Sequence, residues 1–117
     1  MTLNSNKSEY LQIIEKIRCD IVAGIYKPGT KLPSIRKLAL DFSVNPNTMH
    51  RALLELEKDY LIYSIKTNGK YVTSDIAVIN ELKNVLVIKN IDDFLNKMKS
   101  LGLYDEEIIS LVSKKVI

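Results

Sequence analysis

Two segments with helical spacing of apolar residues lie between residues 32 and 61, and only a short turn can separate them. The first segment begins after Ser34, whose side chain can accept a hydrogen bond from a first-turn N–H that has no helical partner. Residues 43–44 are too few to form anything except a turn. Asn45 can then cap a second helix, and Pro46 at its first position loses only an N–H that would be unpaired anyway. We therefore expect the chain to fold around two helices joined by a tight turn.

The two helices are predicted to share a buried side, and the second also has a polar side. Apolar residues at spacings of three and four predict that the buried side consists of Leu38, Ala39, Phe42, Met49, Ala52, Leu53 and Leu56. The opposite side of the second helix carries Asn47, Thr48, His50 and, nearer the flank, Arg51. Amides, hydroxyls and cations of this kind can bond base edges in the major groove of DNA. The alternative is that Asn47 and Thr48 only extend the cap that Asn45 begins.

Composition narrows the class of protein. The 117 residues suit one domain, or one small domain with an appendage, and 46% hydrophobic residues suffice for a core. No apolar run approaches the roughly 18 residues of a membrane span, and the first ten residues lack the apolar core of a signal peptide. We therefore expect a cytoplasmic protein with no membrane partner. Cys19, the single cysteine, cannot form an internal disulfide, and His50, the single histidine, cannot build a metal site with it at any usual spacing, so no metal and no cofactor are predicted.

Charge is distributed unevenly along the chain. Residues 1–74 contain eleven Lys and Arg against seven Asp and Glu, whereas residues 75–117 contain six against seven. The positive field therefore lies on the half that contains the helix pair, as phosphate binding would need. This excess is modest, and many inert surfaces have one of the same size.

A helix before the pair and a hairpin after it complete the predicted first domain, residues 1–74. Ser8 can cap a helix over residues 9–23, which Gly24 ends. Residues 61–66 and 71–73 are rich in β-formers, and Asn68-Gly69 between them is a strong hairpin signal. Three helices followed by a small hairpin form a winged helix-turn-helix domain, mostly α with a β-hairpin wing. Lys66 and Lys70 flank the wing tip and are predicted phosphate contacts.

Residues 75–117 are predicted to form a two-helix dimerisation tail, folded as a helical hairpin. Asp75 or Ser74 would cap one long helix running to residue 101, either straight or kinked near residues 89–90; Gly102 would end it, and Asp105 would cap the last helix. The tail is too small to enclose a metabolite and too apolar to stand free in water, so we expect it to pair with a second copy. The alternative is that it folds back on its own winged domain. The predicted interface consists of Ile79, Leu82, Leu86, Phe94, Leu95, Met98, Ile108, Leu111 and Val112.

The chain resembles the GntR family of transcription regulators, and more narrowly its YtrA-like branch. The matching pattern covers about residues 8–74 and consists of Tyr10, Ile13, Ile21, Gly24, Pro28-Gly29, Leu32-Pro33-Ser34, Arg36, Leu38-Ala39, Val44-Asn45-Pro46-Asn47-Thr48, Arg51-Ala52, Leu56-Glu57, Leu61-Ile62, Gly69 and Tyr71-Val72. The resemblance implies a dimeric DNA-binding regulator, commonly a repressor encoded near transporter genes. By position, it places a phosphate- and base-contacting arginine at Arg36 and the wing-tip glycine at Gly69.

The sequence also departs from the family pattern. Many members have arginine where Pro46 and His50 stand, which changes the operator that can be read. Glycine is common at the positions of Ser43, Tyr60 and Thr67. The complete predicted DNA-binding set is Arg36, Asn45, Asn47, Thr48, His50, Arg51, Lys66, Gly69 and Lys70.

The function expected from these observations is sequence-specific regulation of transcription by a homodimeric repressor. Two recognition helices about 34 Å apart would read a pseudo-palindromic site in double-stranded DNA. An unknown small-molecule effector would have to act at the dimer interface or between the domains. The alternative is an architectural or protein-interaction module without sequence-specific regulation. An enzyme is not expected, since the sequence contains neither a Ser/His/acid or Cys/His set nor a Gly-rich phosphate loop.

Overall fold

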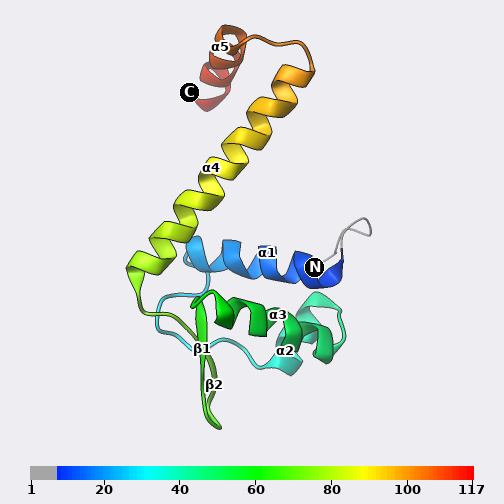
Figure 1. Cartoon of the computed structure of the whole chain (residues 1–117), viewed down its shortest axis with the longest axis vertical. Helices are drawn as coiled ribbons and strands as arrows, with labels where there is room; N and C mark the ends of the chain where they lie inside the picture. The colour runs from blue at the N-terminus through cyan, green and yellow to red at the C-terminus, as the bar shows by residue number, and fades with distance from the viewer. Residues whose placement is uncertain (1–7) are drawn as a thin grey trace. The chain divides into compact units, whose positions relative to one another are not determined.

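The computed structural model describes residues 8–117 (Figure 1). Its elements are α1 (Glu9–Val22), α2 (Ile35–Phe42), α3 (Pro46–Lys58), β1 (Ile62–Ile65), β2 (Gly69–Val72), α4 (Ile76–Ser100) and α5 (Asp105–Val116). The mostly helical class with a small antiparallel hairpin is therefore confirmed. The chain divides into two compact units, Met1–Leu82 and Lys83–Ile117. The division falls within α4, so the first unit extends beyond the predicted boundary at residue 74.

Side-chain caps begin the first three helices where the sequence predicts them. Ser8 accepts a hydrogen bond from the Leu11 N–H at 3.2 Å, and Ser34 accepts one from the Lys37 N–H at 3.1 Å. Asn45 accepts one from the Asn47 N–H at 2.8 Å, with Pro46 as the first residue of α3. Each cap satisfies a donor that the helix itself leaves unpaired.

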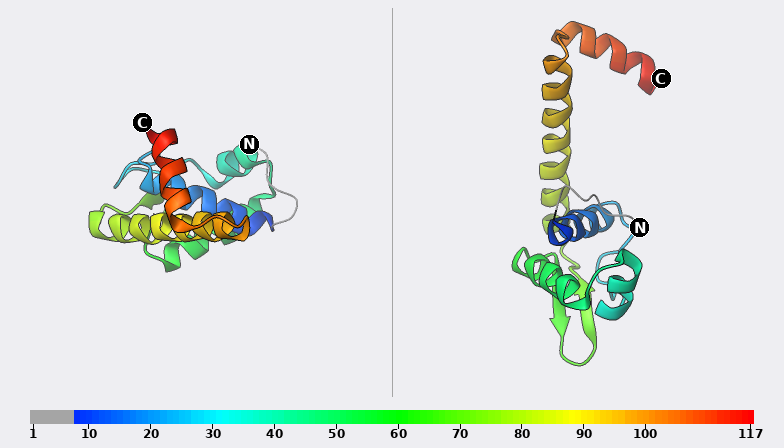
Figure 2. Two further views of the ribbon diagram at one scale, coloured as in Figure 1. Left: turned by 90° about the horizontal axis from the view of Figure 1, so that it is seen from above. Right: turned by 90° about the vertical axis from the view of Figure 1, so that its right-hand side faces the viewer.

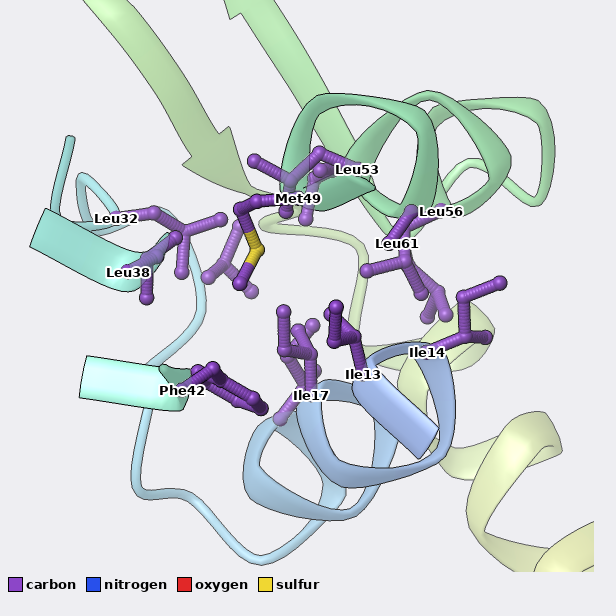
Figure 3. Packing of buried hydrophobic residues seen from close by; sticks show 14 of the residues in the cluster. Ile13, Ile14, Ile17, Leu32, Leu38, Phe42, Met49, Leu53, Leu56 and Leu61 are labelled. Carbon is purple, nitrogen blue, oxygen red and sulfur yellow. The ribbon is translucent and has the colours of Figure 1, made fainter. Parts of the chain in front are cut away.

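The core of the first unit lies between α1, α2 and α3. Figure 3 shows Ile13 and Ile17 of α1, Phe42 of α2 and Met49 of α3 pointing toward one another. The predicted stripe of α2 and α3 is buried in full. Each large apolar side chain buried in this way contributes about 1.5–3 kcal/mol. This packing fixes the rotation of α3 about its axis, and with it the direction of the polar side.

The hairpin differs from the prediction in its turn. Ile65 pairs with Gly69, so the loop consists of residues 66–68 and Gly69 already belongs to β2. The β-rich runs predicted at residues 61–66 and 71–73 therefore differ from the observed strands, since residue 66 lies in the loop and β2 begins two residues earlier. The positive φ values lie at Thr67 (62°) and Gly69 (103°), and the Asn68 N–H donates to the Ile65 carbonyl at 3.0 Å. Thr67, with its backbone in the left-handed conformation, thus takes the place in the turn that an Asn-Gly pair would have in a two-residue hairpin loop.

A third segment pairs with the other edge of β2. The Leu32 N–H donates to the Lys70 carbonyl at 2.8 Å, and the Val72 N–H donates to the Thr30 carbonyl at 2.9 Å, with Lys31 opposite Tyr71. Local spacing along the chain does not predict this pairing, because it joins residues about forty positions apart. The pairing holds the segment before α2 against the wing.

The first turns of α4 complete this unit. The Asp75 carboxylate accepts a hydrogen bond from the Ala77 N–H at 3.0 Å, as one of the two predicted caps. Ile79 is only 6% exposed and belongs to the core cluster, and Leu82 packs against the same cluster. The prediction that Ile79 faces a partner needs correction, because its side chain is already covered within one chain.

The second unit contains the rest of α4 and all of α5. The helix continues without a break through residues 89–90, as the prediction of one long helix requires, and Gly102 ends its final turn with φ of +87°. Asp105 is the first residue of α5 and not its cap. The Glu107 carboxylate accepts the Tyr104 N–H at 3.0 Å, which makes Tyr104 the capping position.

Most apolar side chains of the second unit remain exposed. Figures 1 and 2 show α5 leading away from the end of α4 instead of lying along it. Ile108, one of the predicted interface residues, is buried, so it has little surface left for a partner to contact. The other predicted positions in this unit are exposed or half-buried: Leu86, Phe94, Leu95, Met98, Leu111 and Val112. In the part of the chain that the structure describes, no helix combines the length and apolarity needed to cross a bilayer.

Candidate nucleic-acid interface

The start of α3 presents polar groups to solvent. Met49 is fully buried, and this anchors the helix so that its neighbours face outward. Asn45, Asn47 and His50 are exposed, and Thr48 is half-buried. The amide oxygen of the Asn45 side chain accepts the capping hydrogen bond, which leaves its NH₂ group able to donate to another molecule. The predicted base-reading residues therefore occupy one open helix end.

A groove of about 670 Å³ lies between the start of α2, the outer side of α3 and the wing, all within the first unit. Of the predicted set, five residues line this groove, namely Arg36, His50, Lys66, Gly69 and Lys70. None of the described residues that line it is acidic. Figure 1 shows the hairpin beside α3, as a winged helix-turn-helix domain requires. The groove thus combines positive charge with the His50 imidazole of α3, whereas Asn45, Asn47 and Thr48 are not among its lining residues.

Arg36 differs from its neighbour Lys37 in having a free head group. The Lys37 ammonium lies 3.1 Å from the Asp41 carboxylate one turn along α2. Arg36 is exposed, lines the groove, and forms no ion pair with another described residue. An unpaired guanidinium in this position can bind a phosphate with two parallel hydrogen bonds.

Arg51 does not join the groove. Its guanidinium carbon lies 4.7 Å from the ring centroid of Tyr10, which places it over an aromatic face of α1. Burial, together with the Glu55 carboxylate, raises the pKa of the Tyr10 hydroxyl above its ordinary value. The predicted role of Arg51 in DNA binding therefore concerns the flank of α3 and not the groove.

Lys70 lines the groove but is largely engaged inside the protein. Its ammonium lies 3.2 Å from the Glu57 carboxylate and donates to the Ser64 hydroxyl at 3.0 Å. The side chain of Lys70 is only 12% exposed. The sequence predicted it as a free cation beside the tip, because its acidic partner lies thirteen residues earlier, in α3.

Lys31 belongs to the candidate site, although the sequence did not predict a role for it. It is exposed, lines the groove, and forms no ion pair within the described part of the chain. Its Cε would lie 3.2 Å from a Cβ added at Gly69, so the absence of a side chain at Gly69 leaves room for the end of the Lys31 side chain. The available signal was a lysine directly before the Leu32-Pro33-Ser34 helix start.

Comparison with known proteins points to the same part of the chain. The family described as "Bacterial regulatory proteins, gntR family" matches residues 9–72. The transcriptional repressor YtrA of Bacillus subtilis (strain 168) is 41% identical over 66 residues, which are 56% of this chain and 51% of YtrA. This agrees with the resemblance to the YtrA-like branch.

Two solved structures extend the comparison. A GntR family transcriptional regulator from Listeria monocytogenes is 39% identical, with a TM-score of 0.89 over 96% of this chain and 98% of its own. The AraR DNA-binding domain, solved in complex with operator ORX1, is 28% identical, with a TM-score of 0.56 over 62% of this chain and 89% of its own. Since the matched residues 9–72 make up more than half of the chain and build the whole groove, the chain belongs to the gntR family of bacterial regulatory proteins.

Proposed function

We propose that the protein is a homodimeric transcriptional repressor that binds a pseudo-palindromic operator through two copies of α3. The observation that carries the proposal is the groove that Arg36, His50 and Lys66 line together, and none of its described lining residues is acidic. Phosphate contacts from the cations would set the register on the duplex, and the amides and imidazole of α3 would select bases. The solved complex of the AraR DNA-binding domain with its operator supports DNA as the ligand.

Repression follows from where the protein would bind. A dimer on promoter DNA excludes RNA polymerase from the same surface, and no further activity is required for that. The relative YtrA is named a repressor, which supports this sign of regulation. The protein would act in the cytoplasm, where bacterial DNA lies.

The second unit supports the dimer. Its two helices leave large apolar side chains in water, among them Ile88, Ile91 and Phe94 of α4 and Ile109 and Leu111 of α5. Exposed apolar surface of this extent is typical of an interface between subunits. A second copy of the unit would cover these side chains and bring two winged domains to one DNA molecule.

The direct test is selection of bound DNA from a random-sequence pool with the full-length protein. A repressor of this kind should enrich a site with two inverted half-sites, about 34 Å or one helical turn apart. An unenriched pool, with random DNA competing as well as the selected site, would overturn sequence-specific regulation and favour an architectural role.

Arg36 and Lys37 offer a matched pair for testing the groove. Arg36→Ala should weaken binding to all sequences and reduce the slope of log K against log salt by about 1.8, because each of the two protomers of a dimer loses one phosphate contact, which contributes about 0.9. Lys37→Ala should change the slope much less, because its ammonium is paired with Asp41. Equal effects of the two substitutions would contradict the assigned role of Arg36.

A further inference from the structure

We infer that Glu57 is a positioning residue that clamps the wing to α3, and that Lys31 takes the phosphate contact that Lys70 cannot make. The inference rests on the proposed DNA-binding function and goes beyond it, because it says how the wing is held and which cation serves it. The groove contains three wing-side lysines at residues 31, 66 and 70, and the structure distinguishes between them by their partners.

The clamp consists of one carboxylate and two groups on different strands. Glu57 contacts the Lys70 ammonium on β2 at 3.2 Å, and it accepts a hydrogen bond from the Ser64 hydroxyl on β1. Lys70 and Ser64 are cross-strand partners and are themselves bonded at 3.0 Å. The three side chains thus form a closed triangle between the recognition helix and both strands of the wing.

Burial makes this triangle more than a surface ion pair. The Glu57 side chain is 23% exposed and that of Lys70 is 12% exposed. A pair shielded to this degree is screened less by salt than an exposed pair, and its geometry restricts two elements at once. Glu57 also lies seven residues after His50, which places both on the same side of α3. The clamp therefore sets the angle of the wing relative to the residues that would read bases.

Lys31 is free where Lys70 is bound. It belongs to the segment that pairs with the other edge of β2, so its backbone is held beside the wing while its ammonium has no acidic partner among the described residues. Its contact with Gly69 places it against the start of the same strand. A cation with a fixed backbone and a free head group is suited to a phosphate contact.

The direction in which Glu57→Gln changes the operator affinity distinguishes a positioning role of Glu57 from simple repulsion between its carboxylate and the phosphates. Removing a negative charge near DNA strengthens binding if the charge only repels phosphates. If Glu57 positions the wing, Glu57→Gln weakens operator binding, by at least about threefold for a residue coupled within one network. Glu55→Gln is the matched control, since it removes a carboxylate from the same helix whose partners, Lys58 of α3 and Tyr10 of α1, do not lie on the wing.

The experiment measures the affinity of the full-length protein for its selected operator as a function of salt. Lys31→Gln should reduce the salt slope by about 1.8, one phosphate contact for each protomer of the dimer, whereas Lys70→Gln should weaken binding with the slope unchanged. The double variant Glu57→Gln with Lys70→Gln should be no weaker than either single variant. The exchanged pair Glu57→Lys with Lys70→Glu should recover part of the loss. Thermal unfolding of each variant establishes that it is folded.

A second measurement follows the free protein, so that it does not depend on DNA binding. Hydrogen exchange of the Asn68 amide, which closes the wing tip, should be faster in Glu57→Gln and unchanged in Glu55→Gln. Tighter binding by Glu57→Gln, or unchanged exchange at Asn68, would overturn the clamp. A slope change of about 1.8 for Lys70→Gln, or none for Lys31→Gln, would overturn the assignment of the phosphate contact. Failure of the wild type to select any operator would instead refute the proposed function.

Discussion

Replacing Tyr60 with glycine is predicted to stabilise the protein. Tyr60 follows the C-terminal end of α3 with φ of +62°, and its N–H donates to the Glu57 carbonyl at 3.0 Å. This left-handed position is the one that glycine usually occupies at the end of a helix. In any other residue the Cβ approaches the following carbonyl oxygen, at a cost of about 1–2 kcal/mol.

The magnitude follows from what the tyrosine side chain contributes in return. It is 78% exposed. Unfolded chains themselves hide roughly 10–40% of their surface, so folding removes almost none of this side chain from water. Against the relief of strain stands the greater entropy of glycine in the unfolded chain, about 0.4–1 kcal/mol. The net expectation is a gain of about 0.5–1 kcal/mol, or roughly 2–8 °C in Tm for a unit of this size.

The assay is thermal unfolding at a fixed protein concentration, because the Tm of a dimer depends on concentration. Tyr60→Ala is the control, since it removes the same side chain and keeps the Cβ. The glycine variant should unfold above the wild type, and the alanine variant should not. A Tm for Tyr60→Gly equal to or below that of Tyr60→Ala would show that backbone strain at this position is not the controlling term.

Three further predictions concern the core, the tail and one ion pair. Met49→Ala should lower the free energy of unfolding by about 2–5 kcal/mol, measured by urea titration, because it leaves a cavity between the helices; a loss below 1 kcal/mol would contradict the packing. Phe94→Asp should convert a dimer into a monomer in sedimentation at micromolar concentration, and a wild type that is itself monomeric would refute the proposed interface. The hydrogen bond from Lys58 lowers the pKa of the Glu55 carboxyl. This pair therefore stabilises the fold fully at pH values above the ordinary carboxyl pKa. The stabilisation is lost as the pH falls through the lowered pKa of Glu55. Lys58→Gln should therefore raise the Glu55 pKa in an NMR titration, and an unchanged value would exclude the pair as its cause.

Local features of the fold could be predicted because they depend on neighbours in the chain. The caps at Ser8, Ser34 and Asn45 each join groups two or three residues apart. The buried side of α2 and α3 follows from the helical period alone. The same spacing places Asn47 and His50 on the open side of α3, so this part of the candidate site was also accessible from sequence.

Features that depend on distant partners could not be predicted. Asn68-Gly69 looks like a two-residue turn, but pairing between the strands selected a three-residue loop closed by Thr67. Ile79 has the spacing of an interface residue, yet the core of the winged domain was near enough to cover it. In both cases tertiary packing decided between two conformations or environments that local spacing allows equally.

The chain by itself determined which residues lie on the exposed end of α3, because burial of Met49 leaves only one rotation of that helix. It did not determine which cations around that helix are free. From the sequence alone, Lys70 and Lys31 cannot be distinguished, since each is a lysine next to β-forming or helix-starting residues. Only the folded structure brings Glu57 to Lys70 and leaves the Lys31 ammonium unpaired among the described residues. The physical reason is that an ion pair depends on a few ångströms of separation in space, which a distance of thirteen or twenty-six residues along the chain does not specify.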